Sequence, residues 1–239
     1  MKSLIFNNLL LIYFFIGFST INFSYTVSLS TGLLNTSSND RTFTAVISNT
    51  KQKPAILEFK MLEVLPTQNN INSYKLESNE FKIFPEKVIV MPNQEKLITI
   101  HFKGSDISQE RLFYFKTVPY APQEDDDSSS PLNIKFLTSY EKIITLTKKN
   151  LKSNLIISAK KIINDTSQIL SITLKNDGKT LYRSKNLNLK VKTSDGTFKI
   201  HNKELNNSNF TIFPNKPITV EIPWPDNINK EAKIKSIKY

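Results

Sequence analysis

The stretches RLFYFKTVPYAP (Arg111–Pro122) and PLNIKFLTSYEKIITL (Pro131–Leu146) decide the expected fold. Both alternate apolar and polar residues, as β-strands do, and an acidic, serine-rich loop separates them. In the second stretch the even-numbered positions form a nearly continuous apolar row: Leu132, Ile134, Phe136, Thr138, Tyr140, Lys142, Ile144 and Leu146. A strand of about 15 residues is far longer than usual. The row therefore serves either its own domain and the linker, or another chain.

The rest of the chain also alternates with period two, and amphipathic helices are scarcely visible. The first series of strand-like segments comprises Thr26–Ser30, Arg41–Ser48, Pro54–Val64, Phe81–Pro92 and Lys96–Lys103, followed by the two stretches above. The second series comprises Leu155–Ile162, Gln168–Asn176, Asn186–Thr193, Thr197–Ile200 and Pro217–Trp224, with a tail that could close the second sheet. The pattern predicts an all-β protein of two immunoglobulin-like β-sandwich domains, residues 25–148 and 152–239, joined by a short polar hinge.

The two halves contain similar segments. FKIFPEKVIVMPNQEKLITI, which begins at Phe81, and FTIFPNKPITVEI, which begins at Phe210, both place Phe-x-Ile-Phe-Pro before a strand. Either an internal repeat or a chance similarity between β-rich segments explains this.

Residues 1–24 have the features of a secretory signal peptide. Met1-Lys2-Ser3 is a short basic start, and the apolar core Leu9–Phe18 is shorter than a membrane span. Ser19 and Ser24 offer cleavage points, and an uncleaved signal anchor is the alternative. We therefore expect an exported chain without a membrane span in its mature part.

The formal net charge of +11 does not by itself indicate a nucleic-acid site. Such a site would gather its basic residues on one face among aromatic residues, whereas the lysines here are scattered along the strands. We expect no nucleic-acid partner, and a modest attraction to an acidic partner or a lipid surface stays open. Five glycines and the lack of a phosphate-binding motif argue against nucleotides, and the absence of cysteine excludes disulfides and thiolate chemistry.

Catalytic residue sets are not recognisable in the sequence. His101 and His201 fall in different predicted domains, within strand-like segments, and we interpret them as structural or surface residues. The acidic run Glu124–Ser130 lacks the glycine turn and the distant bidentate carboxylate of a calcium loop, and Trp224 is interpreted as a packing residue. We therefore predict no enzyme activity, no metal site and no cofactor.

Several segments of residues 25–148 resemble the periplasmic chaperones of chaperone–usher pilus assembly. They are TVSLS, RTFTAVISNTKQKPAILEFKM, FKIFPEKVIVMPNQEKLITIHF, ERLFYFKTVPYAP and LNIKFLTSYEKIITL. Residues 152–239 match loosely, through LKNDGK and FPNKPITVEIPWP, while VPYAP and TSYEKI look most like the variants that serve alternate or archaic pili. The resemblance implies a periplasmic protein whose two immunoglobulin-like domains form a boomerang.

Members of this family lend a strand to pilin subunits, which are incomplete sandwiches. The resemblance implies that Leu132, Ile134 and Phe136 are the donated residues and that Thr138 and Tyr140 extend the row. It also implies pilin or fimbrial subunits and an outer-membrane usher as partners. A self-capping homodimer stays open.

The carboxylate anchor of this family is incomplete in the present sequence. The best-known members hold the subunit's terminal carboxylate with an arginine in the first strand and a lysine in the donated strand. Tyr25–Ser38 contains neither Arg nor Lys, and an ungapped overlay puts Glu141 near the lysine position. Lys142 is therefore the first anchor candidate and Arg111 the second.

The alternative function is a secreted two-domain β-sandwich that acts as an adhesin or structural binding module. It would use exposed loops rather than the edge of Leu132–Leu146.

Overall fold

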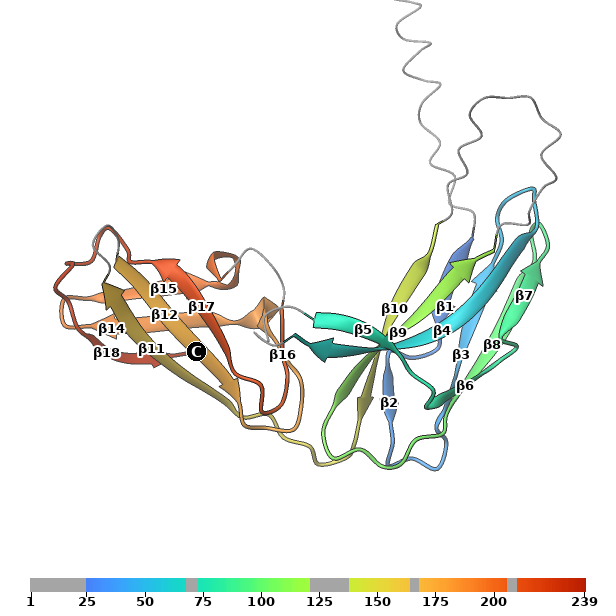
Figure 1. Cartoon of the computed structure of the whole chain (residues 1–239), viewed down its shortest axis with the longest axis horizontal. Coiled ribbons are helices and arrows are strands. Elements are labelled where there is room, and N and C mark those ends of the chain that lie inside the picture. The colour runs from blue at the N-terminus through green and yellow to red at the C-terminus, as the bar shows by residue number, and fades with distance from the viewer. Residues whose placement is uncertain (1–24, 68–72, 121–137, 164–167, 206–209) are drawn as a thin grey trace, which may run out of the picture.

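The computed structural model describes residues 25–67, 73–120, 138–163, 168–205 and 210–239. Strands β1–β10 form one sandwich and β11–β18 form a second, and the two are set at an angle that gives a boomerang outline (Figure 1). The described residues contain no α-helix and two short 3-10 turns, Ser184–Asn186 and Asn202–Glu204. The predicted all-β class with two immunoglobulin-like sandwiches is confirmed.

The first sandwich packs a four-stranded sheet against a six-stranded sheet. The four-stranded sheet has the order β1 (Thr26–Leu29), β3 (Thr42–Ser48), β8 (Glu95–Phe102) and β6 (Phe81–Phe84). The six-stranded sheet has the order β2 (Leu33–Asn35), β10 (Tyr140–Thr147), β9 (Arg111–Pro119), β4 (Ala55–Pro66) and β5 (Ser73–Glu77), and β7 (Lys87–Val90) also pairs with β4. Alternate residues of the two sheets fill one core around Ile47, Ile100 and Phe113, all fully buried.

The second sandwich contains two three-stranded sheets and a short two-stranded ladder. One sheet has the order β11 (Leu155–Ile163), β12 (Gln168–Asn176) and β17 (Ile218–Pro223), and the other β15 (Thr197–His201), β14 (Asn188–Thr193) and β18 (Ile234–Lys238). The ladder joins β13 (Tyr182–Arg183) to β16 (Thr211–Ile212). Trp224 is buried against Phe198 and donates from Nε1 to the carbonyl of Ile228 at 3.3 Å, so its predicted packing role is confirmed.

The prediction of one strand over Phe81–Pro92 is wrong. The segment divides at Pro85, and its two halves enter different sheets, because β6 pairs with β8 while β7 pairs with β4. Proline has no N–H to donate to a ladder, which makes it a natural point for the chain to leave one sheet for the other.

A buried asparagine ties one corner of each sandwich. Asn49 is fully buried, and its Nδ2 donates to the carbonyls of Lys53 at 2.9 Å and Val90 at 2.8 Å. Its Oδ1 accepts the N–H of Lys51 at 3.0 Å. All the polar atoms of this side chain are therefore used on backbone groups, which would otherwise be buried without partners.

Asn176 makes the same contacts in the second sandwich. It is fully buried, donates to the carbonyls of Thr180 at 2.7 Å and Ile212 at 3.1 Å, and accepts the N–H of Gly178 at 3.0 Å. Both sandwiches thus use one asparagine to join a turn to a neighbouring strand.

This corner shows which parts of the two halves correspond. Asn93 and Asn215 have positive φ values of 56° and 58°, and their N–H groups donate to the carbonyls of Asn49 and Asn176, both at 2.8 Å. The Pro-Asn turn that begins at Pro92 therefore corresponds to the one that begins at Pro214. FKIFP and FTIFP therefore do not occupy corresponding places in the two sandwiches, because the counterpart of IFPN is VMPN; of the two explanations left open, this favours chance similarity for that pair of segments.

Replacing either asparagine by alanine should destabilise only its own sandwich. Asn176→Ala leaves two carbonyls and one N–H without partners, and we expect the free energy of unfolding to fall by roughly 2–4 kcal/mol. The single tryptophan, Trp224, lies in the second sandwich, so its fluorescence in urea reports Asn176→Ala directly. Asn49→Ala should instead shift the transition of the first sandwich, and the exposed Asn188→Ala serves as the control. Equal effects of all three variants would contradict the assigned role.

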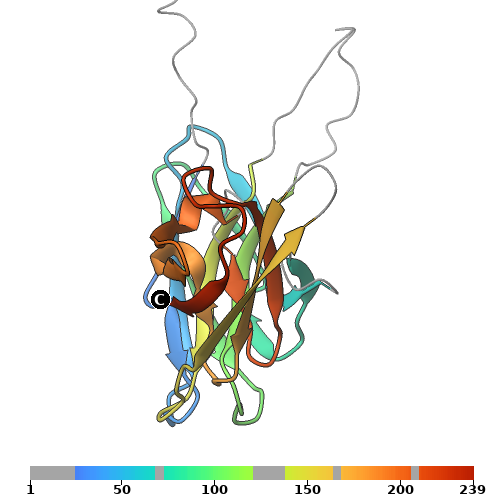
Figure 2. The ribbon, with the colours of Figure 1, turned by 90° about the vertical axis from the view of Figure 1, so that its left-hand side faces the viewer.

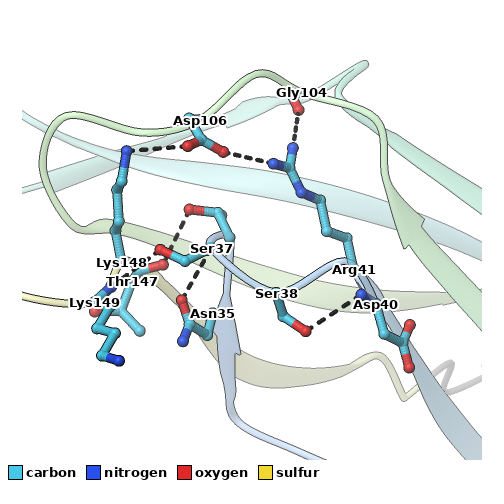
Figure 3. Close-up of polar contacts among 11 residues, drawn as sticks. Asn35, Ser37, Ser38, Asp40, Arg41, Gly104, Asp106, Thr147, Lys148 and Lys149 are labelled. Atoms are coloured by element: carbon cyan, nitrogen blue, oxygen red, sulfur yellow. Dashed lines mark hydrogen bonds and ion pairs between the residues drawn. The ribbon is translucent and has the colours of Figure 1, made fainter.

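Hydrogen bonds fix the start of the linker between the sandwiches. The N–H of Thr36 donates to the carbonyl of Thr147 at 2.9 Å, and the N–H of Lys149 donates to Oγ of Ser37 at 3.3 Å. Nζ of Lys148 lies 3.0 Å from the carboxylate of Asp106, which also pairs with Arg41 (Figure 3).

The end of the linker is fixed against the β12–β13 turn. The N–H groups of Asp177 and Lys179 donate to the carbonyls of Asn154 and Lys152, both at 2.8 Å. Between them, a Cβ on Gly178 would lie 2.4 Å from the backbone nitrogen of Asn154, so only glycine fits without a shift. The segment predicted as a hinge is thus hydrogen-bonded at both ends.

Glu110 joins the two sandwiches directly. Its N–H donates to the carbonyl of Lys179 at 2.7 Å, and its Oε2 accepts the N–H of Leu181 at 2.8 Å. Its Oε1 accepts the hydroxyl of Thr147 at 2.7 Å. One carboxylate therefore holds the linker, the first sandwich and the second sandwich together.

Removing this carboxylate should loosen the angle between the sandwiches. In Glu110→Ala the N–H of Leu181 and the hydroxyl of Thr147 lose a charged acceptor, a loss of roughly 1.5–3 kcal/mol. Small-angle X-ray scattering should then show a broader distribution of overall dimensions. The control is Glu95→Ala, at an exposed position of β8, and a Glu110→Ala profile identical to it would contradict the assignment.

Candidate functional site

Strand β10 is paired along its length on one side and along part of its length on the other. Its antiparallel ladder with β9 runs from Tyr140 opposite Thr117 to Leu146 opposite Arg111. On the other side β2 pairs in parallel with Thr145–Thr147 only. Among the residues that the structure describes, the edge of β10 before Thr145 has no strand partner.

The backbone groups on this open edge can be identified. The N–H of Thr145 donates to the carbonyl of Gly32 at 2.9 Å, on the side away from β9, whereas the N–H of Tyr140 donates to Oγ1 of Thr117 on β9 at 3.0 Å. Successive residues of a strand direct their backbone groups to opposite sides. The N–H and C=O groups of Glu141 and Ile143 therefore face the open edge and could pair with a further strand.

The apolar row predicted for β10 turns inward at its end. Ile144 and Leu146 are fully buried in the core of the first sandwich, so at this end the row serves its own domain, which is one of the two alternatives the sequence left open. Tyr140 is half-buried and packs against the same core, and its predicted part in subunit binding stays a prediction. Thr138 is exposed. Leu132, Ile134 and Phe136 lie outside the described residues, and their role stays a prediction.

Tyr25 fixes the start of β10. Its ring is buried, and its hydroxyl donates to the carbonyl of Thr138 at 2.7 Å and shares a hydrogen bond of 2.8 Å with Thr117. The rings of Tyr25 and Tyr140 meet edge to face with centroids 4.9 Å apart. Burial raises the pKa of Tyr25 above its ordinary value of 10.0; the hydrogen bond to Thr117 opposes this rise and the nearby Tyr140 adds to it.

The anchor candidate Arg111 is already paired within the first sandwich. Its Nε and one Nη lie 2.8 Å from the two carboxylate oxygens of Glu63, and its guanidinium also donates to Glu80 at 2.5 Å and 3.1 Å. The hydrogen bonds to Glu63, helped by those to Glu80, raise the pKa of Arg111 above its ordinary value, so it stays charged. We assign Arg111 to the framework of the sandwich rather than to a binding site.

Lys142 is exposed and makes no ion pair with the residues described. It shares a face of the sheet with Ile144, while Glu141, Ile143 and Thr145 lie on the other face. That other face meets the second sandwich, since Arg183 lies 3.5 Å from Oγ1 of Thr145. The structure thus directs Lys142 away from the second sandwich, and its role as an anchor stays a prediction.

Sequence reasoning missed a charged network on the face that carries Glu141. The carboxylate of Glu141 pairs with Lys75 of β5 and lies 3.9 Å from Nζ of Lys116. Lys75 also lies 4.3 Å from the ring centroid of Tyr114, a cation–π distance. The alternation of SYKLE (Ser73–Glu77) was the available signal for β5, but no pattern in the sequence brings Lys75 to Glu141.

The histidines occupy surface positions. His101 Nδ1 lies 3.0 Å from Oγ1 of Thr42, and His201 Nδ1 lies 3.0 Å from Oδ1 of Asn188. Within the described ranges, no group of three or more His, Cys, Asp or Glu residues could hold a metal ion. Nor does this part of the chain contain a helix of the length and hydropathy that a membrane crossing requires. The acidic run Glu124–Ser130 and residues 1–24 lie outside it.

Solved structures of fimbrial chaperones share this architecture. The Class 5 fimbriae chaperone CfaA is similar with a TM-score of 0.56 at 13% identity, over 88% of this chain and 99% of that one. A chain of the chaperone–tip adhesin complex of CFA/I fimbriae biogenesis gives 0.57 at 13% identity, over 90% and 98%. The CsuC–CsuE pre-assembly complex from the archaic chaperone–usher Csu pili of Acinetobacter baumannii gives 0.55 at 11%, over 86% and 90%.

The chain has the fold of the fimbrial chaperones. The resemblance seen in the sequence is thereby confirmed at the level of the fold. No family model matches the sequence, and no curated protein matches it either. The similarity to these chaperones therefore lies in the three-dimensional arrangement of the strands rather than in the sequence. That arrangement includes β10 beside β9.

Replacing Tyr25 by phenylalanine should weaken the attachment of β10. Tyr25→Phe removes the hydrogen bonds to Thr138 and Thr117, and we expect a loss of roughly 1–2 kcal/mol in the free energy of unfolding at neutral pH. Because the pKa of Tyr25 is raised in the folded state, its contribution is complete below pH 10 and is lost as the pH rises through the folded value. Urea unfolding followed by circular dichroism from neutral to alkaline pH measures both effects. The exposed Tyr74→Phe is the control, and an equal pH profile for both variants would refute the assignment.

Proposed function

We propose that this protein is an exported chaperone that binds pilin or fimbrial subunits by strand donation and delivers them to an outer-membrane usher. Strand β10 and the segment before it, Leu132–Ser139, would complete the subunit's unfinished sheet. The similar CfaA is a fimbrial chaperone, and the CsuC–CsuE and CFA/I structures are chaperone–adhesin complexes, which supports a chaperone role with fimbrial subunits as partners.

The open edge of β10 is the observation that carries the proposal. Glu141 and Ile143 present backbone N–H and C=O groups that no described strand satisfies. An added strand gains affinity from such main-chain hydrogen bonds, while alternate side chains that enter pockets give specificity. Because β9 and Tyr25 hold the other side of β10, the edge is presented on a rigid support, which lowers the entropy lost on binding.

The side chains that enter the subunit would come from the segment before β10. Leu132, Ile134 and Phe136 are spaced by two residues, so they would lie on one face of an extended strand. Thr138 is exposed and continues the row, and Tyr140 would support it from inside the sandwich. Lys142 would supply a cation next to the open edge, for a carboxylate of the subunit.

Location and processing belong to the same proposal. Residues 1–24 would act as the signal peptide, and the mature chain would work in the periplasm. No covalent chemistry is required, since binding and release exchange one set of strand contacts for another. The competing adhesin function would place its contacts on exposed loops. Whether partner binding depends on β10 therefore distinguishes the two functions.

Charged residues in the donated row should abolish subunit binding. With Ile134→Asp and Phe136→Asp, a carboxylate would have to enter an apolar groove without a partner, and we expect the subunit recovered with the chaperone to fall at least about tenfold. The measurement is co-purification of a tagged chaperone with a co-expressed pilin-like subunit. Leu97→Asp is the matched control, because Leu97 is 60% exposed on the other sheet. Unchanged recovery of the subunit with the double variant would exclude strand donation.

A proline at the open edge tests the backbone contribution separately. The N–H of Ile143 faces the edge and not β9, so Ile143→Pro should leave the first sandwich folded while removing one donor for the added strand. We expect weaker subunit binding with a nearly unchanged circular dichroism spectrum. In Ile144→Pro the lost N–H faces β9, so this variant should lose stability instead. Full subunit binding by Ile143→Pro would show that pairing does not reach this part of β10.

A further inference from the structure

The positive charge of the protein is concentrated in its second sandwich. Residues 152–239 contain 16 basic and 7 acidic residues, a formal charge of +9, whereas residues 25–148 contain 14 of each. A neutral first sandwich suits the binding of an apolar segment. The asymmetry indicates that the second sandwich has an electrostatic partner of its own.

A row of lysines crosses the sheet β15–β14–β18. Lys190 of β14 lies directly opposite Lys199 of β15 and directly opposite Lys238 of β18. All three are exposed, and Lys192, two residues along β14, lies on the same face. We call these four residues the lysine face; they belong to the sandwich that faces the viewer in Figure 2.

The lysine face contains no opposite charge. The other outward positions that pair in register with this face carry small polar residues or histidine: Asn188, Thr197, His201 and Ser236. None of the four lysines forms an ion pair with a residue that the structure describes. Like charges directly opposite each other destabilise a sheet, so this arrangement lowers the stability of the second sandwich. A feature that lowers stability, with no compensating contact to any residue in the described ranges, points to a binding role.

We propose that the lysine face binds an anionic lipid surface. Neighbouring strands lie about 4.7–4.9 Å apart, so the ammonium groups spread over a flat area rather than meeting at one point. Fifteen of the 16 basic residues in 152–239 are lysine, which acts as a mobile point charge and suits diffuse attraction, whereas arginine suits planar recognition of single carboxylates. Each lysine near an anionic bilayer contributes about a fivefold gain in affinity.

An acidic protein partner fits these observations less well. Specific protein interfaces have a buried centre with aromatic or aliphatic anchors, and the lysine face has no apolar side chain among its outward positions. Tyr239, next to Lys238, is 63% exposed, and tyrosine is favoured where an apolar surface meets lipid headgroups. This surface is separate from β10, so the proposal does not depend on subunit binding.

Vesicle sedimentation tests the proposal with the purified protein. We expect binding to phosphatidylcholine vesicles that contain phosphatidylglycerol, little binding to phosphatidylcholine alone, and a decrease with added salt. The triple variant Lys190→Glu, Lys199→Glu, Lys238→Glu should bind at least about 100-fold more weakly. The matched control has the same net charge, with Lys160→Glu, Lys175→Glu and Lys216→Glu at exposed positions off the lysine face, and should lose much less affinity.

Stability provides the second measurement. Lys190→Glu alone converts two like-charged pairs into opposite-charged pairs, so its Tm should rise while its vesicle binding falls. Loss of binding through misfolding would instead lower the Tm. Equal losses of vesicle binding in the two triple variants would show that only the net charge of the protein matters, and this would overturn the proposal.

Binding to polyglutamate without binding to anionic vesicles would also overturn it, because the partner would then be an acidic protein.

Discussion

The ladder between β9 and β10 is the constraint on which the rest of the structure depends. Through it, Ile144 and Leu146 enter the core of the first sandwich, and the end of β10 leads directly into the linker. On the opposite edge, no strand of the described residues pairs with β10 before Thr145, where the ladder with β2 begins. One strand therefore closes its own sandwich at one end and presents an open edge at the other.

Period-two alternation predicted most of the longer strands, though not β2, β5 or β13, and it did not show which face of a strand is covered. The apolar row of β10 is visible in the sequence, yet whether Ile144 meets the core or a partner depends on where the four-stranded sheet lies. The division of Phe81–Pro92 depends on Pro85, whose effect on sheet pairing is local and was available from the sequence. The hydrogen-bonded corner at Asn49 could not be predicted from the sequence, because the acceptor, the carbonyl of Val90, lies 41 residues further along the chain.

The candidate site was predictable in its location and less so in its residues. The position of Lys142 and Arg111 on adjacent strands follows from alternation and pairing. The pairing of Arg111 with Glu63 and Glu80 does not follow from them, because these carboxylates come from β4 and from the turn before β6, 48 and 31 residues earlier in the chain. Likewise, Lys75 reaches Glu141 across a sheet whose strand order the sequence leaves undetermined. Contacts of this kind follow from the order of strands, which local patterns do not encode.

Glu141 and Lys142 also affect how the free protein behaves in concentrated solution. An exposed edge with unsatisfied backbone groups is a template on which further molecules can stack, and many β-proteins suppress such stacking with charged residues at the edge. Two adjacent ionic side chains, one on each face of β10, mark this very position. They would oppose growth of ordered aggregates from like molecules, while an apolar partner that covers the neighbouring segment could still overcome them.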